Sequence, residues 1–214
     1  MSYRCGIIAA MPDDRARVLD LLAGIEPLDR MERDHRDAAV GWAASGAPLY
    51  RTRPPDVPPT HLVSYFVVVD EAGRLLLAAH RKAGLWLPPG GHVEPGEDPW
   101  HTVVRECAEE LRLAAVPAGA SAPLFVTVTA TRGPGTHTDV SLWYLLAARA
   151  EQVGWYDEGE FAGIRWLSPG EVLAEPAEVL DPHMHRFTRK LARQPGSAGG
   201  HGGDAGQGGA HRGL

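Results

Sequence analysis

Cysteine and long apolar runs are scarce in this 214-residue chain. It has two cysteines, Cys5 and Cys107, and we expect Cys107 to lie on the packed face of a helix, so the sequence predicts no disulfide framework and favours a reducing compartment. No stretch approaches the roughly 20 apolar residues that cross a bilayer, and the run from Cys5 to Ala10 is too short for a signal-peptide core. These absences argue against a disulfide-stabilised secreted domain and favour a cytoplasmic protein without membrane association.

Positive charge is also in short supply. The chain has 21 lysines and arginines against 27 acidic residues, for a net charge of −6. Binding to a nucleic-acid backbone needs clustered cations, so we expect no stable nucleic-acid binding and a small anion as partner. A chain of this length with 44% hydrophobic residues can bury one core and carry appendages, and the composition is compatible with a homodimer.

Changes in composition divide the chain into four segments. We expect a disordered leader over 1–10, a helical pair with a proline-rich linker over 11–60, the main domain over 61–194, and a disordered glycine-rich tail over 195–214. The tail has almost no aliphatic side chain, so burial cannot offset the entropy lost on ordering it. Met11 could serve as the start site equally well as Met1.

Two helices are expected before the main domain. Asp13 and Asp14 begin the first and Gly24 ends it, whereas Pro27 begins the second and Gly46 ends it. Residues 47–60 contain five prolines and are expected to form an extended linker.

From residue 61 the periodicity becomes that of strands. Residues 62–70 and 74–80, with Gly73 in the turn between them, predict a hairpin. A second strand pair is expected at 124–131 and 140–148, and a short strand at 163–167. Ser168 and Pro169 begin a helix, and a last helix is expected at about 182–192.

The most informative pattern lies in residues 91–113, which read GHVEPGEDPWHTVVRECAEELRL. Asp98 suits a helix cap and Pro99 a first turn, so a helix is expected from there to about Leu111. At about 100° per residue, two opposite stripes result. The apolar stripe is Trp100, Val104, Cys107 and Leu111, and the acidic stripe is Glu106, Glu109 and Glu110.

The acidic stripe calls for a counter-ion. Carboxylates within one helical turn repel each other by several tenths of a kcal/mol per pair. Hard divalent cations take oxygen ligands, and Mg²⁺ shares its coordination shell with substrate phosphates. The alternative is a solvated acidic helix face. The turn at Pro88–Gly91 favours binding, because glycine lets the backbone approach a ligand closely.

The spacing in residues 91–113 resembles the Nudix box, G-x5-E-x7-R-E-U-x-E-E-x-G-U, in which U is aliphatic. One position departs from it, because Arg112 stands where the family has glycine; an arginine there lengthens the helix or costs about 1 kcal/mol. The resemblance implies an α/β/α sandwich with a mixed sheet over about residues 61–192, here preceded by the helical pair.

The resemblance also implies roles for individual residues. The metal would be Mg²⁺, or Mn²⁺ in its place, held by the Gly90 carbonyl, Glu106, Glu109 and Glu110. Glu97 would orient Arg105 across the loop. Glu106 is the candidate that polarises or deprotonates the attacking water, although family members differ in which glutamate is the base. The catalytic set is therefore Glu106, Arg105 and Glu97.

Three further candidates, Arg81, Lys82 and Glu160, lie on either side of the box. Arg81 and Lys82 lie on the approach to the glycine loop and are candidate phosphate contacts, with an ordinary solvated turn as the alternative. Glu160 is favoured over Glu158 as an additional metal carboxylate, a position where many family members supply one, and surface charge is the alternative.

Three more candidates concern the variable half of the substrate. His137 lies between two expected strands and could contact a base or sugar, although a solvated loop is favoured. Arg186 opens the last helix, where the related fold often contacts the substrate, and helix-end polarity competes equally. Trp86 is expected to be a core residue and could stack on a nucleobase.

The resemblance implies a metal-dependent hydrolase that cleaves the pyrophosphate bond of a nucleoside diphosphate derivative. A MutT-like enzyme acting on a (deoxy)nucleoside triphosphate is favoured, and residues 128–131 lack the proline or tyrosine that some other members carry. The alternatives are an ADP-ribose or sugar-nucleotide pyrophosphatase and a non-catalytic nucleotide sensor. Arg112 is the argument for a sensor, and the presence of all four glutamates is the argument against it.

Overall fold

The structure is a computed structural model that describes residues 13–53, 58–131 and 136–194. The predicted leader at 1–10 and tail at 195–214 lie outside these residues. The described strands form one mixed sheet in the order β3-β2-β1-β6-β5, with β4 also paired to β1 and β7 to β2. Their bounds are β1 Thr60–Val69, β2 Leu75–His80, β3 Leu85–Leu87, β4 Gly90–His92, β5 Phe125–Ala130, β6 Thr138–Ala147 and β7 Phe161–Leu167.

Strand β1 is the centre of this sheet. Its sequence THLVSYFVVV is rich in β-branched and aromatic residues, which suit a strand buried on both faces. It pairs parallel to β6 along its whole length and antiparallel to β4. The predicted strands are observed to within three residues, but β3 and β4 were not predicted, because GGH has no β-forming residue and becomes a strand only by pairing with β1.

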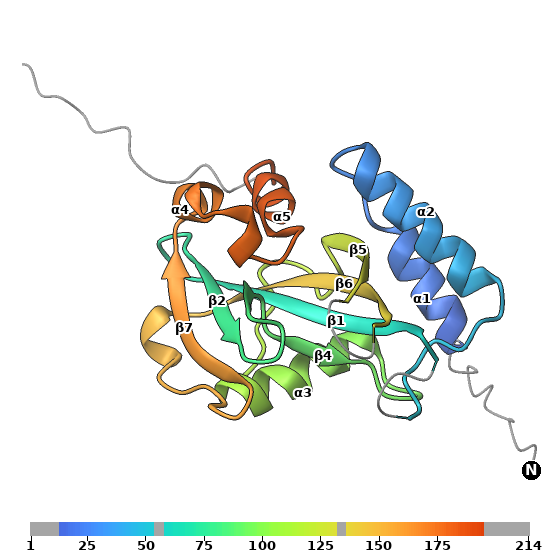
Figure 1. Ribbon diagram of the computed structural model, residues 1–214, viewed down its shortest axis with the longest axis horizontal. Coiled ribbons are helices and arrows are strands. Elements are labelled where there is room, and N and C mark those ends of the chain that lie inside the picture. The colour runs from blue at the N-terminus through green and yellow to red at the C-terminus, as the bar shows by residue number, and fades with distance from the viewer. Residues whose placement is uncertain (1–12, 54–57, 132–135, 195–214) are drawn as a thin grey trace, which may run out of the picture.

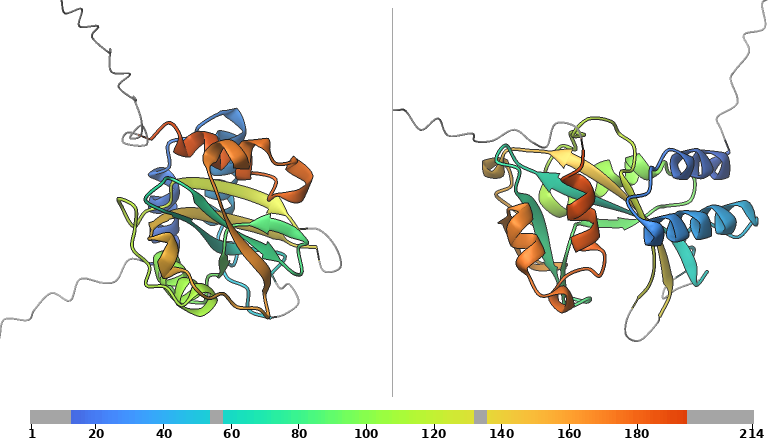
Figure 2. Two further views of the ribbon diagram at one scale, coloured as in Figure 1. Left: turned by 90° about the vertical axis from the view of Figure 1, so that its left-hand side faces the viewer. Right: turned by 90° about the horizontal axis from the view of Figure 1, so that it is seen from above.

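Helices cover both faces of the sheet. Helix α3 (Pro99–Leu111) lies on one face, and α4 (Pro169–Ala174) and α5 (Met184–Leu191) lie on the other, as Figures 1 and 2 show. Leu62, Phe66 and Val68 of β1 belong to the apolar cluster under α3, and Val67 belongs to the cluster under α4 and α5. The predicted α/β/α sandwich is confirmed.

The two N-terminal helices, α1 (Asp14–Ala23) and α2 (Arg30–Ala44), are confirmed with one correction. Helix α2 begins at Arg30 and not at Pro27, because the Asp29 side chain accepts a hydrogen bond from the Glu32 backbone N–H at 2.8 Å and caps the helix there. Buried Leu22 of α1 and Ala39 of α2 belong to the same apolar cluster as the sheet residues. None of the described helices is long and apolar enough to cross a membrane.

Helix α2 is also tied to the C-terminal helix. It packs on β5, and the Lys190 Nζ of α5 donates to the Glu32 Oε1 at 2.5 Å, with both side chains buried. Next to this pair, the Arg186 guanidinium donates to both carboxylate oxygens of Asp29. The helical pair therefore packs into the same body as the sheet.

Candidate active site

Helix α3 starts and ends where its sequence predicts. The Asp98 side chain accepts a hydrogen bond from the Trp100 backbone N–H at 2.8 Å, and Pro99 occupies the first helical position. The predicted apolar stripe is partly wrong, since Val104 is 41% exposed and Val103 is fully buried. Val103 lies four residues before Cys107, so it shares the face that packs on the sheet.

The predicted acidic stripe does not lie wholly opposite the buried face, because Glu110 is itself buried. This side chain is only 2% exposed, and its Oε2 accepts a hydrogen bond from the Gly90 backbone N–H at 3.0 Å. Burial, and after it the charges of Glu106 and Glu160, raise the pKa of Glu110 to about 10. The glycine loop therefore covers this carboxyl, and its anionic form needs a cation.

The glycine loop comes so close to α3 that no side chain fits. A Cβ on Gly91 would lie 1.9 Å from the Glu106 Oε1, and a Cβ on Gly90 would lie 2.2 Å from the Ser64 carbonyl oxygen. The pairing of β4 with β1 fixes this position, because Gly91 is opposite Ser64 in the register. The two glycines therefore bring the backbone within reach of whatever the carboxylates bind.

Arg105 joins the loop to the helix. Its Nε donates to the Glu97 Oε1 at 3.1 Å, its Nη1 to the Glu106 Oε1 at 2.7 Å, and its Nη2 to the His92 carbonyl oxygen at 3.2 Å. The Thr102 hydroxyl donates to the other Glu97 oxygen at 2.7 Å. The expected ion pair between Glu97 and Arg105 is thus present, and it holds Glu106 in place.

A further carboxylate reaches this site from the loop before β7. Glu160 acts electrostatically on both Glu106 and Glu110, raising their pKa values after the larger effect of burial. Its Oε1 lies 3.3 Å from the His80 Nε2, and this hydrogen bond contributes most to lowering the pKa of Glu160. The sequence analysis missed His80, because a histidine at a strand end carries no local sign of its partner 80 residues away.

Comparison with known proteins identifies the family of this chain. The family model of the NUDIX domain matches residues 59–191, which is more than half of the chain. The chain belongs to the Nudix family. It is 33% identical over 136 residues to a MutT-like protein of Streptomyces ambofaciens, covering 61% of this chain and 80% of the relative. It is 28% identical over 133 residues to the CTP pyrophosphohydrolase of Escherichia coli (strain K12), covering 60% and 92%.

The fold of solved structures agrees with this assignment. The MutT NUDIX hydrolase from Burkholderia pseudomallei superposes with a TM-score of 0.51 at 23% sequence identity, over 62% of this chain and 98% of that one. That likeness shows the shared fold, while the domain match shows the family. The chain is thus a Nudix hydrolase, and the N-terminal helical pair lies outside the matched region.

Arg112 departs from the Nudix box but keeps the backbone shape that glycine would give. It does not lengthen the helix: its φ of 51° and ψ of 35° are left-handed, and its N–H donates to the Ala108 carbonyl oxygen. Such a conformation costs a non-glycine residue about 1 kcal/mol. Its guanidinium lies 3.9 Å from the Trp155 ring centroid, a cation–π contact that offsets part of this cost.

The other predicted residues are divided between the site and the scaffold. Lys82 lines a cavity of about 180 Å³ together with His80, Asp157 and Glu160, and Arg81 donates from its Nε to the Glu158 carbonyl oxygen at 2.8 Å. Arg186 lies in the contact between α2 and α5, paired with Asp29. The His137 ring stacks on that of His61, and its Nε2 lies 3.1 Å from the Asp139 Oδ1.

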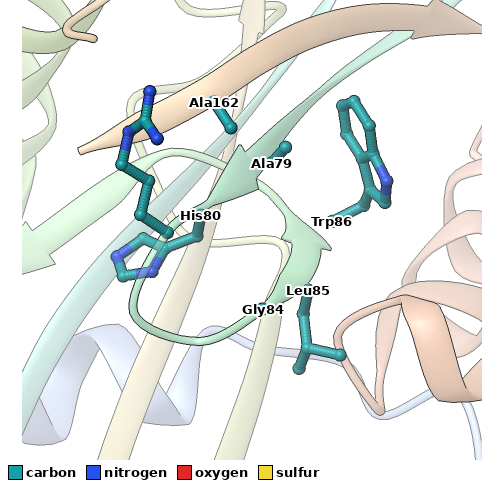
Figure 3. Close-up of a pocket in the computed structure, with 7 residues that line it drawn as sticks. Ala79, His80, Gly84, Leu85, Trp86 and Ala162 are labelled. Atoms are coloured by element: carbon teal, nitrogen blue, oxygen red, sulfur yellow. The ribbon is translucent and has the colours of Figure 1, made fainter. Parts of the chain in front are cut away.

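A second cavity, of about 370 Å³, adjoins the first and shares His80 with it. Figure 3 shows the Trp86 indole and the His80 imidazole on either side of Ala79 and Ala162. The indole is half-buried, and the Arg165 guanidinium lies 4.2 Å from its ring centroid. Trp86 therefore both packs against the apolar cluster and lines a cavity.

Proposed function

We propose that this Nudix hydrolase uses Mg²⁺ to cleave the pyrophosphate bond of a (deoxy)nucleoside triphosphate. The observation that carries the proposal is the convergence of Glu106, Glu110 and Glu160 under a glycine loop that has no room for side chains. Clustered carboxylates beside a backbone segment without side chains are suited to bind a hard cation together with a phosphate chain.

The residues present fit a divalent metal ion. Burial and mutual repulsion destabilise the charged forms of Glu106 and Glu110, and a dication would stabilise both. The Gly90 carbonyl, Glu106, Glu109, Glu110 and Glu160 would hold it. When bound, such an ion neutralises phosphate charge and lowers the pKa of water. Mn²⁺ would serve in its place, because it accepts the same oxygen ligands.

The side chains around the metal position would orient the reactants. Glu106 is held by the Arg105 Nη1, so one oxygen is fixed and the carboxylate is positioned to take a proton from water. Arg105 is in turn fixed by Glu97. Lys82, on the rim of the smaller cavity with Glu160, would bind phosphate oxygens that the metal does not reach. Arg81 would add charge at the same turn.

A nucleobase would occupy the larger cavity. Its volume, the smaller cavity beside it and the Trp86 side chain that lines it suit an aromatic ring at the end of a phosphate chain. The likeness to a CTP pyrophosphohydrolase supports a triphosphate substrate. An ADP-ribose or sugar nucleotide is the second candidate, since its diphosphate presents the same oxygens to the carboxylates.

A substrate panel tests this proposal. Nucleoside triphosphates, ADP-ribose and nucleotide sugars are incubated with the protein and Mg²⁺ or Mn²⁺, and released phosphate and pyrophosphate are measured. We expect hydrolysis of at least one triphosphate above all diphosphate derivatives, and none in the presence of a chelator. Preference for a diphosphate derivative would contradict the substrate assignment, and nucleotide binding without hydrolysis would favour a sensor.

A further inference from the structure

Three histidines and an aspartate meet at the other face of the glycine loop. Nitrogen atoms of His61, His92 and His137 and a carboxylate oxygen of Asp139 all lie within 4.8 Å of one another. The His61 side chain is fully buried, while those of His137 and Asp139 are 16% and 13% exposed, so the group opens to solvent on one side. We call these four residues the imidazole cluster.

Strand register brings the cluster together. His61 of β1 is opposite Asp139 of β6, and His92 of β4 is opposite Val63 of β1. Side chains at alternate positions of a strand point to the same face, so His61, Val63, His92 and Asp139 share one face. Gly91 points to the opposite face, toward Glu106. The cluster is therefore separated from the carboxylate site by the backbone of β4.

Hydrogen bonds define which nitrogens of the cluster carry protons. The His61 Nδ1 lies 2.9 Å from the Pro58 carbonyl oxygen, which can only accept, so this nitrogen carries a proton. The Thr131 hydroxyl donates to the His137 carbonyl oxygen and can accept from the His137 Nδ1 at 3.2 Å. In the neutral tautomers of both rings, the Nε2 lone pair is then directed into the cluster.

Both Nε2 atoms point at the same oxygen. The Asp139 Oδ1 lies 3.5 Å from the His61 Nε2 and 3.1 Å from the His137 Nε2. Ligands at about 2.0–2.1 Å from a tetrahedral zinc ion are about 3.3 Å apart, which is close to both distances. The His92 ring completes the group, with its centroid 4.8 Å from that of His61. Within the described ranges, its Nε2 is buried and has no hydrogen-bond partner.

We propose that His61, His92, His137 and Asp139 bind one transition-metal ion of the zinc type, at a site separate from the Nudix carboxylates. Three imidazoles and one carboxylate form a borderline-soft set that selects such ions over Mg²⁺. The Pro58 carbonyl and the Thr131 hydroxyl act as the outer partners that orient two of the ligands. This metal site does not depend on whether a nucleoside triphosphate is the substrate.

Cobalt provides a direct probe, because tetrahedral Co²⁺ has strong visible absorption. Untagged, full-length protein is stripped of metal, saturated with Mg²⁺ and titrated with Co²⁺ and then with Zn²⁺. We expect the absorption to rise until one equivalent of Co²⁺ has been added, and to disappear when Zn²⁺ displaces the Co²⁺. His137→Gln and Asp139→Asn should each weaken Co²⁺ binding at least tenfold, with unchanged far-ultraviolet circular dichroism.

Controls assign the ion to the cluster. His101→Gln, at an exposed position of α3, and the pair His201→Gln and His211→Gln should leave the titration unchanged, as should Glu106→Gln. Absence of tetrahedral absorption in the parent would overturn the proposal, whatever the variants do. Loss of the signal in the His201 and His211 variant, or in Glu106→Gln, would place the ion elsewhere and would also overturn it. None of these measurements depends on hydrolysis.

Discussion

Helices α2 and α3 each bury a glutamate almost completely, and the surroundings of the two side chains are opposite. Glu32 of α2 is fully buried and receives hydrogen bonds from the Lys190 ammonium and the Leu28 backbone N–H. Glu110 of α3 is 2% exposed, receives the Gly90 N–H, and is surrounded by Glu106, Glu160 and Asp157.

The difference separates a structural carboxylate from a binding one. A buried ion pair whose partner belongs to the same chain is complete on folding and joins two elements. A buried carboxylate among other carboxylates is incomplete, because burial and repulsion both disfavour its charge. Both glutamates are buried, so burial does not distinguish their roles. The sign of the neighbouring charge does.

The largest effect is expected from a change in the carboxylates of the proposed metal site. Glu106→Gln replaces a charged oxygen by a neutral amide of the same shape, so hydrolysis of the best substrate should fall about 100-fold or more with little change in melting temperature. Steady-state rates and thermal melting measure the two effects. Glu158→Gln, at an exposed position, is the matched control, and a rate for Glu106→Gln within threefold of the parent would contradict the assignment.

The buried ion pair of Glu32 and Lys190 should respond in the opposite way, with a loss of stability and an unchanged rate. Glu32→Gln leaves the buried Lys190 charge without its anion, so we expect a loss of about 3 kcal/mol in the free energy of unfolding, measured in urea. The turnover of the remaining folded protein should match that of the parent. The double variant Glu32→Gln, Lys190→Met should recover part of the loss; a single-variant loss below about 1 kcal/mol would show that the pair contributes little.

Glu110→Gln sharpens the comparison most directly. Without metal, the raised pKa keeps Glu110 protonated near neutral pH, so this change replaces one neutral group by another and should alter stability by less than about 1 kcal/mol. The parent should gain about 2.7 kcal/mol from Mg²⁺ at 100 times its dissociation constant, and this gain should be much smaller in the variant. Melting curves with Mg²⁺ and with chelator test it. An equal Mg²⁺ gain in both proteins would remove Glu110 from the proposed metal site.

The smallest effect is expected at the end of α3. Arg112→Gly relieves a left-handed arginine but loses the contact with Trp155 and adds freedom to the unfolded chain, so stability should change by about 1 kcal/mol or less. The rate of hydrolysis should be unchanged. A parent that is inert on the whole substrate panel, and is made active by this substitution, would identify the natural protein as a sensor.

The sequence predicted most of the local structure and little of what lies across the fold. The cap at Asp98 and the hairpin follow from short-range patterns, and the ion pair between Glu97 and Arg105 is implied by the family resemblance; all three are observed. Helical spacing misplaced Val104 and Glu110, because the rotation of α3 is set by packing on the sheet and by the covering loop. No local pattern could show that Glu32 meets Lys190, 158 positions away.

The neighbouring positions Gly91 and His92 tie the length of the glycine loop to both sites at once. Successive side chains of a strand point in opposite directions, so deleting one residue between Pro88 and Gly90 would move the His92 imidazole to the place where a single Cβ already lies 1.9 Å from Glu106. The same deletion would withdraw an imidazole from the cluster. A change of two residues would restore the facing of the strand but would place Val93 or Pro89 opposite Ser64, where any Cβ meets Glu106, so the loop length itself is fixed and would have to be kept in any grafting of this loop onto another Nudix scaffold.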